Sequence, residues 1–166
     1  GIAMNIVLIG MSGAGKSTLG ILLAKALGMD FADTDIAVQR RRGMLLQEII
    51  DADGIDGFLR AEESAILGLR LERCVIATGG SAVYSERAMR SLGAGGVVVY
   101  LSLPYDELGE RLTNISRRGV VIKPGSRLFD VYRERLPLYR KYSDITVDCS
   151  GRTVEECVAE VLAALH

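Results

Sequence analysis

The hydrophobic positions of this 166-residue chain alternate between short continuous runs and helical spacing. Continuous apolar runs predict buried strands, and apolar side chains that recur every three or four residues predict helices with one buried face. The runs predict five strands, at residues 4–9, 30–33, 74–78, 97–101 and 145–147. The spacing predicts helices at residues 18–27, 35–42, 44–51, 57–71, 85–92, 126–142 and 153–165, and one that begins with Pro104 just inside it. The helix at 126–142 is expected to be interrupted by Pro137.

This alternation predicts an α/β fold, with one parallel sheet that helices cover on both faces. No linker or internal repeat interrupts the pattern, so a single domain over residues 1–166 is expected. Ligands of such folds gather at the carboxyl ends of the strands. Polar residues follow several of these ends, which predicts that they share one rim of the sheet.

The first of these polar segments, Gly10–Ser17, matches the phosphate-binding loop pattern of a Gly, four residues and Gly-Lys-Ser. It lies between a predicted strand and a predicted helix, where its backbone N–H groups can turn toward phosphate oxygens. Lys16 would reach the outer phosphates, and the Ser17 hydroxyl would hold Mg²⁺. We therefore expect a bound nucleoside triphosphate, held by Gly13, Ala14, Gly15, Lys16, Ser17 and Thr18.

Two acidic residues, Asp33 and Asp35, follow the second predicted strand. Asp33 is expected to hold a metal-bound water, and Asp35 to accept or orient the proton of an acceptor hydroxyl. A purely structural alternative is helix capping, because Asp33 and Thr34 precede a helix. Together with the loop, the two carboxylates favour phosphoryl transfer, which requires positioning and charge neutralisation more than covalent chemistry.

Residues 115–126 combine Gly, Pro and Arg with little periodicity. A segment of this kind with guanidinium groups is typical of a lid that closes over phosphates. We expect Arg118 to act from this lid, whereas a role in the lid and a solvent-exposed surface position are equally favoured for Arg117. The run Arg40–Arg42 is interpreted as the charged end of a helix.

The charge balance of 20 basic and 21 acidic residues argues against nucleic acid as a partner. No apolar run is long enough to span a membrane, and no signal peptide is evident. Three cysteines beside apolar segments predict free thiols in a reducing cytoplasm. The sole histidine is His166, which excludes a histidine base or a histidine metal site. A monomer is expected, because no heptad or exposed apolar stripe is evident.

The chain resembles the shikimate kinase family along nearly its whole length. The resemblance is carried by an ordered set of motifs: Gly10–Thr18, Asp33-Thr34-Asp35, Phe58 with Glu62, Gly79-Gly80, the lid, and Arg135-Leu136-Pro137-Leu138-Tyr139. It implies a three-layer fold with a five-stranded parallel sheet in the order 2-3-1-4-5. It also implies that the chain moves the γ-phosphate of ATP to a ring hydroxyl of shikimate, a small hydroxy acid, with Mg²⁺ as cofactor.

On the nucleotide side, the resemblance implies that Lys16 and Ser17 are the phosphate and Mg²⁺ residues and that Asp33 is the acid near the metal. Arg111 and Arg152 fall where the family flanks the adenine.

On the acceptor side, the resemblance implies that Asp35 grips the acceptor hydroxyls and that Gly79 and Gly80 contribute backbone donors. Arg118 falls at the lid arginine that contacts phosphate, and Arg135 at the arginine that pairs with the substrate carboxylate. The helices that bind substrate are expected within residues 35–71.

Three departures from the family pattern cluster on the acceptor side. Leu59 stands where an Arg normally grips the carboxylate, and Arg60 beside it would point about 100° around the helix. Ser81 replaces the usual third Gly, and the usual Arg-Pro-Leu-Leu of the lid reads Arg118-Gly119-Val120-Val121. Leu cannot supply the paired hydrogen bonds of a guanidinium.

These departures leave the acceptor open. Shikimate is the best-supported acceptor, with Arg60 or Lys123 taking over the carboxylate. Alternatives are a kinase for another small hydroxy acid, such as homoserine or less favourably gluconate, a nucleoside monophosphate kinase, and a regulatory nucleotide-binding module without turnover. The presence of Asp35 argues against the last, because a pure binder needs no acid on the acceptor side.

Overall fold

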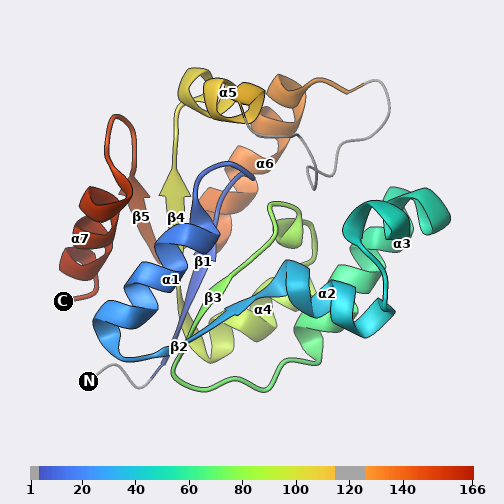
Figure 1. Cartoon of the computed structure of the whole chain (residues 1–166), viewed down its shortest axis with the longest axis horizontal. Coiled ribbons are helices and arrows are strands. Elements are labelled where there is room, and N and C mark those ends of the chain that lie inside the picture. Colours follow the sequence, from blue (N-terminus) through green and yellow to red (C-terminus); the bar gives the residue numbers. More distant parts are fainter. Residues whose placement is uncertain (1–3, 115–125) are drawn as a thin grey trace.

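The structure is a computed structural model that describes residues 4–114 and 126–166 (Figure 1). Its strands are β1 (Asn5–Ile9), β2 (Asp30–Asp33), β3 (Cys74–Ala77), β4 (Gly96–Ser102) and β5 (Ile145–Asp148). Its helices are α1 (Lys16–Leu27), α2 (Thr34–Arg42), α3 (Leu46–Leu67), α4 (Glu86–Ala94), α5 (Tyr105–Asn114), α6 (Leu128–Tyr142) and α7 (Val154–Ala164), with a short 3₁₀ helix η1 (Ala82–Tyr84).

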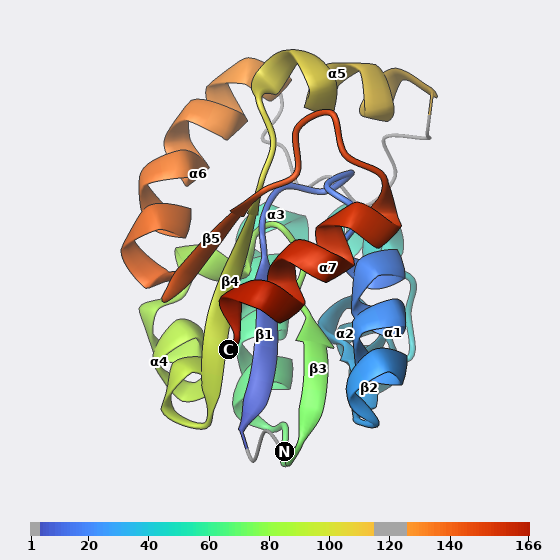
Figure 2. The ribbon, with the colours of Figure 1, turned by 90° about the vertical axis from the view of Figure 1, so that its left-hand side faces the viewer.

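The five strands form one parallel sheet in the order β2-β3-β1-β4-β5, which confirms the predicted fold class and strand order. Residues Ile6–Ile9 of the central strand are fully buried. A strand this apolar requires cover on both faces, and the helices provide it. Helices α1 and α7 lie on one face of the sheet, and α4 and α6 lie on the other (Figure 2).

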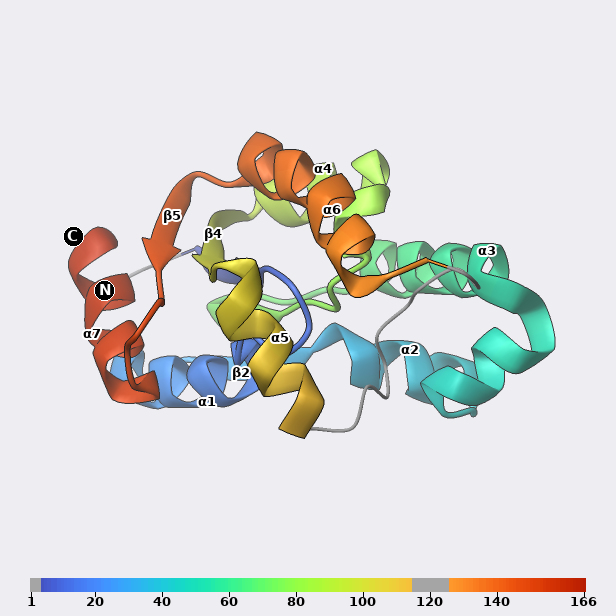
Figure 3. The ribbon, with the colours of Figure 1, turned by 90° about the horizontal axis from the view of Figure 1, so that it is seen from above.

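Helices α2 and α3 extend away from β5 and α7 and stand apart from the sheet (Figure 3). They have a small core of their own, separate from that of the sheet. It consists of Val38, Ile49, Phe58, Ala61 and Ala65. The packing of α3 is nonetheless continuous with the rest of the fold, because its later part packs against α4 and its Ile66 belongs to the core of the sheet.

Residues 44–51 and 57–71 were predicted as two helices, and the structure joins most of both into α3. The backbone leaves helical geometry at Gly54, with φ +73° and ψ 179°, a conformation that glycine adopts without steric cost. The two predicted helices are therefore present, separated at Gly54, and the second ends at Leu67 rather than at residue 71.

Three local features also differ from expectation. Helix α5 begins at Tyr105, one residue after Pro104. Helix α6 runs without a break through Pro137. The short helix η1 was not predicted. The predicted lid, apart from Ser126, lies outside the described residues. Within the described ranges, no helix has the length and apolar character that crossing a membrane requires.

Candidate functional site

The phosphate-binding loop lies between β1 and α1, as the sequence predicts (Figure 1). Gly15 is the N-cap of α1, with φ +86°, a left-handed conformation that residues with a Cβ rarely adopt. This geometry brings the chain directly from the loop into the helix. The unpaired N–H groups of the first helical turn and the positive end of the helix dipole therefore face the loop. Such an arrangement binds phosphate groups.

The ammonium group of Lys16 is enclosed by this loop. Its Nζ donates to the carbonyl oxygens of Gly10, at 2.6 Å, and Met11, at 2.8 Å. The residue is 7% exposed, and burial lowers its pKa to about 8, an effect that the nearby negative charge of Asp35 partly offsets. The charged form therefore has few favourable partners besides these carbonyls, and phosphate oxygens would be stronger ones.

Asp33 connects the loop to the acceptor side. Its Oδ2 accepts a hydrogen bond from Ser17 Oγ at 2.8 Å, and its Oδ1 accepts one from the backbone N–H of Asp35 at 2.8 Å. The sequence offered two alternatives for Asp33, a cap of the next helix or a place beside the metal. In the structure the same carboxylate caps α2 and contacts Ser17.

A hydroxyl and a carboxylate in contact fit a Mg²⁺ site that takes its other ligands from water and phosphate, which is how this ion commonly binds in nucleotide-dependent enzymes. Consistent with so small a set of protein ligands, the described residues contain no group of three or more His, Cys, Asp or Glu side chains placed to hold a metal.

Asp35 lies in the same cleft as the phosphate-binding loop. The cleft has a volume of about 350 Å³, and the loop, Asp35 and the backbone after β3 line it. The pKa of Asp35 is raised to about 6, chiefly by burial and also by the negative charge of Asp33, whereas Lys16 opposes both. A carboxylate with this pKa is deprotonated at neutral pH yet basic enough to accept a hydroxyl proton.

Gly79 and Gly80 form the opposite wall of the cleft. The N–H of Gly79 donates to Thr34 Oγ1 at 3.0 Å, and Tyr139 donates its hydroxyl proton to the carbonyl oxygen of Gly80 at 2.7 Å. A Cβ at position 79 would lie 2.6 Å from Asp35 Oδ1, and one at position 80 would lie 2.8 Å from Arg135 Nη1. The two glycines therefore let a carboxylate and a guanidinium approach the backbone closely.

Arg135 is 1% exposed and reaches this wall from α6. Its Nε donates to the hydroxyl of Tyr84 at 3.2 Å, and its guanidinium carbon lies 5.2 Å from the centre of the Tyr84 ring. The guanidinium is thus held on an aromatic face beside Gly80, where a cation can bind a carboxylate.

Arg60, by contrast, lies outside this cleft. It is exposed and lines a hollow between α2 and α3 together with Arg41, Arg42 and Asp53. The structure therefore does not bring Arg60 next to Asp35, Gly79 or Gly80. Leu59 lines a hollow of about 150 Å³ with Tyr84 and Glu134, and Leu59 and Arg60 both line a second hollow of about 140 Å³.

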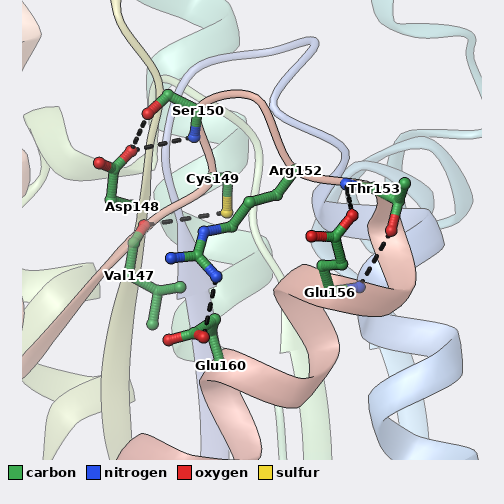
Figure 4. Close-up of polar contacts among 8 residues, drawn as sticks. All are labelled: Val147, Asp148, Cys149, Ser150, Arg152, Thr153, Glu156 and Glu160. Atoms are coloured by element: carbon green, nitrogen blue, oxygen red, sulfur yellow. Dashed lines mark hydrogen bonds and ion pairs between the residues drawn. The ribbon is translucent and has the colours of Figure 1, made fainter.

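The residues expected to flank the adenine come from α5 and from the loop after β5. Arg152 Nη1 pairs with Glu160 Oε1 of α7 at 2.8 Å, beside the turn that Asp148 and Ser150 form (Figure 4). Helix α5 is tied to that loop, because the N–H of Gly151 donates to both oxygens of Glu107, at 3.0 and 3.2 Å. The side chain of Arg111, one turn after Glu107, lies outside the described residues, and so does Arg118.

Three residues of the site were not assigned by sequence. Thr34 orients the backbone of Gly79, Tyr139 orients that of Gly80, and Glu62 is buried beside Gly79. Their motifs offered a signal, because Thr34 stands between two predicted site aspartates and Tyr139 closes the Arg-Leu-Pro-Leu-Tyr motif. Neither motif shows that these side chains bond to the same backbone segment.

The loop, the carboxylate across the cleft and the strand order together define a class, the P-loop kinases that phosphorylate small molecules. Within that class, a shikimate kinase family model matches residues 12–166. The shikimate kinase of Thiobacillus denitrificans is 39% identical over 153 residues, which cover 90% of this chain and 84% of the relative. That of Methylococcus capsulatus is 38% identical and covers 96% and 91%. The chain belongs to the shikimate kinase family, whose members are ATP-dependent kinases of a hydroxyl group.

Solved structures agree with this assignment. The shikimate kinase from Acinetobacter baumannii, solved in complex with shikimate, superposes with a TM-score of 0.89 at 30% identity, over 98% of this chain and 92% of that one. A gluconokinase from Sinorhizobium meliloti has a TM-score of 0.60 at 23% identity, over 98% of this chain and 91% of that one, which shows a shared fold alone.

Proposed function

We propose that this protein transfers the γ-phosphate of ATP to a ring hydroxyl of shikimate. The observation that carries the proposal is that the phosphate-binding loop and Asp35 line the same cleft. Phosphoryl transfer requires the attacking and leaving oxygens to be held in line, and a cleft with phosphate donors on one side and a hydroxyl acceptor on the other meets this requirement. The relatives and the shikimate-bound neighbour support shikimate over homoserine or gluconate.

On the nucleotide side, the backbone N–H groups that open α1 would bind the phosphates. Lys16 would move its ammonium from the two carbonyls to the phosphate oxygens, which compensate better for the cost of its burial. Ser17 and Asp33 would hold Mg²⁺, which supplies charge neutralisation on the phosphates. Arg111 and Arg152 are proposed to flank the adenine, and Arg118 to contact the transferred phosphate.

On the acceptor side, Asp35 would orient the attacking hydroxyl and take its proton. Arg135 would bind the carboxylate of the acceptor, because its guanidinium is buried and fixed against Tyr84. Backbone groups of Gly79 and Gly80 would contact the acceptor ring. Arg60 is a weaker candidate for the carboxylate, since its side chain lies in a different hollow.

We also propose that the protein works as a monomer in the cytoplasm. The proposed location rests on Cys74 and Cys157, two buried thiols that are free of disulfide bonds among the described residues.

The test is a coupled assay of ADP release with Mg²⁺-ATP and shikimate, homoserine or gluconate as acceptor. Turnover with shikimate alone is expected. Turnover with one of the other acceptors would replace the proposed substrate, and tight ATP binding without turnover would replace the kinase with a regulatory module.

A further inference from the structure

A buried carboxyl group lies directly behind the acceptor side of the cleft. Glu62 is 2% exposed, and its Oε1 accepts a hydrogen bond from Ser81 Oγ at 2.7 Å. Its Oε2 is also buried and has no hydrogen-bond partner among the described residues. An ionised carboxylate is costly in such a place, whereas a neutral carboxyl is tolerated.

The charges that face Glu62 come from three elements. Asp35 approaches from α2, Arg135 from α6 and Lys16 from α1. The pKa of Glu62 is raised to about 7, chiefly by burial and also by the negative charge of Asp35, whereas the Ser81 hydrogen bond and the two cations act in the opposite direction. Both Asp35 Oδ1 and Glu62 Oε2 lie within 2.8 Å of where a Cβ on Gly79 would be, so the two carboxyl groups touch the same point of the backbone.

Two departures from the family pattern meet at this carboxyl. Leu59 precedes Glu62 by three residues on α3, a spacing that puts both side chains on one side of the helix. Leu59, Glu62 and Ser81 line one hollow of about 140 Å³, and the charged residues Arg60 and Glu63 of α3 also line it. An Arg at position 59 would supply a cation within reach of Glu62, and a Gly at position 81 would supply no hydroxyl. This chain has exchanged the cation for a hydroxyl.

The exchange alters the charge around Arg135. With no cation at position 59, an ionised Glu62 would offset the positive charge of Arg135 and repel the carboxylate of the acceptor. A neutral Glu62 leaves that positive charge available. The hydroxyl of Ser81 can bond to the neutral carboxyl as well as to the ionised one.

We propose that Leu59, Glu62 and Ser81 form one specificity-determining unit, in which Ser81 fixes the Glu62 carboxyl and Leu59 keeps it neutral, so that Arg135 alone binds the acceptor carboxylate. Glu62 and Ser81 are positioning residues in this arrangement, since they act through Arg135 and Gly79. The proposal rests on the proposed function and specifies how this chain recognises its acceptor.

The first test compares wild type with Glu62→Gln, which keeps the shape of the side chain and cannot ionise. The KM for shikimate of the wild type is expected to rise about tenfold from pH 6 to pH 8, because Glu62 ionises in this interval. Dividing the wild-type KM by the KM of Glu62→Gln at each pH removes the pH effects that both proteins share, such as the ionisation of Asp35. The same ratio for the KM of ATP should stay constant with pH.

The matched control is Glu63→Gln, the same change one residue further along α3. The Glu63 carboxylate points to α4, where it accepts from Ser85 Oγ at 2.5 Å, so this variant should keep the wild-type pH profile. A wild-type to Glu62→Gln ratio that stays constant from pH 6 to pH 8 would overturn the proposal.

The second test is a double-mutant cycle of Leu59→Arg and Ser81→Ala. Ser81 has φ −90° and ψ −4°, which alanine adopts freely. At pH 6, where Glu62 is mostly neutral and only the fixing of its carboxyl is tested, Ser81→Ala should raise the KM for shikimate about tenfold when residue 59 is Leu. The rise should be less than threefold when residue 59 is Arg, because the guanidinium then fixes the carboxyl. Leu59→Arg should also abolish the rise of KM above pH 7. Additive effects of the two substitutions would contradict the coupling.

Failure of the proposed function is distinguishable from failure of this inference. The unfolding free energy needs no substrate: as pH rises from about 4.5 to above 7, the wild type should lose stability relative to Glu62→Gln, since the raised pKa of Glu62 penalises the ionised form. If the wild type lost stability in this way but did not turn over shikimate, the proposed function would be wrong and the neutral state of the Glu62 carboxyl would still be supported. Turnover without the loss would overturn the inference.

Discussion

Ser17 Oγ and Asp33 Oδ2 lie 2.8 Å apart, although the two residues belong to α1 and β2 and are 16 positions apart in the sequence. The other oxygen of the same carboxylate accepts the N–H of Asp35 and so caps α2. One side chain therefore fixes the phosphate-binding loop and the start of the substrate helices relative to each other.

Substitution of Asp33 should separate its two roles. Asp33→Asn keeps an oxygen for the cap of α2, so its stability should stay close to that of the wild type, whereas Asp33→Ala should lose about 1 kcal/mol. Both variants lack the negative charge beside Ser17, and both should lose most of their Mg²⁺-dependent turnover. Thermal unfolding and ADP release measure the two effects. Equal turnover of Asp33→Asn and wild type would remove Asp33 from the proposed metal site.

Lys16 makes nucleotide binding depend on pH. Its lowered pKa of about 8 leaves much of the side chain neutral at pH 8.5, and bound phosphates favour the charged form. ATP binding at pH 8.5 should therefore take up a proton, and binding at pH 6.5 should take up none through Lys16. Isothermal titration calorimetry in buffers of different ionisation enthalpy measures this uptake.

Two lysine variants test the origin of the proton. Lys16→Met should abolish the uptake at pH 8.5 together with phosphoryl transfer. Lys25→Met, at the exposed last turn of the same helix, should keep both. If Lys16→Met retained turnover, the function assigned to the loop would be wrong.

Asp35 should set the acid limb of the pH profile. Its pKa of about 6 predicts that kcat/KM for the acceptor falls about tenfold per pH unit below pH 6 and is level just above it. Asp35→Asn should lose at least about 10²-fold in kcat, the lower range for a general base, while ATP binding persists.

The stability of Asp35→Asn provides a second measurement. A carboxyl with a raised pKa costs the folded state most when ionised, so the wild type should lose stability as pH rises through about 6, and the variant should not. A variant less stable than the wild type at pH 8 would mean that hydrogen bonds of Asp35 outweigh the cost of its burial.

The sequence predicted the elements that depend on local pattern. The four fully buried residues of β1 and the Gly-Lys-Ser turn fix the strand, the loop and the first helix, because periodicity and turn chemistry act over a few residues. The break at Gly54 between the two predicted helices is likewise local, because glycine adopts the positive φ that ends helical geometry there. Pro137 misleads a local interpretation, since the packing of α6 tolerates a proline that an isolated helix would not.

The contacts that complete the site are long-range and could not be predicted. Thr34 meets Gly79 across 45 positions, and Tyr139 meets Gly80 across 59. Ser81 and Glu62 each carry a weak sequence signal: Ser81 departs from the family pattern, and Glu62 belongs to it. Their hydrogen bond, which relates the departures at positions 59 and 81, is visible only when α3 and η1 are placed side by side.

The glycines after β3 allow a direct test of the close approach around the cleft. Gly80→Ala would put a Cβ 2.8 Å from Arg135 Nη1 and 3.3 Å from the backbone nitrogen of Ser12, so the guanidinium and the wall of the loop must move apart. We expect a loss of stability of about 1–3 kcal/mol. The KM for shikimate should rise more than the KM for ATP, since Arg135 serves the acceptor.

The matched control is Gly93→Ala in α4, where nothing lies within 4 Å of the added Cβ and the residue is exposed. Gly93 lies in the last turn of α4, where alanine should stabilise the protein by at most about 0.5–1 kcal/mol and leave both KM values unchanged. The comparison assigns the effect at position 80 to contact with Arg135 rather than to a general change from glycine to alanine. Equal rises in both KM values for Gly80→Ala would instead indicate a displaced phosphate-binding loop and would weaken the assignment of Arg135 to the acceptor carboxylate.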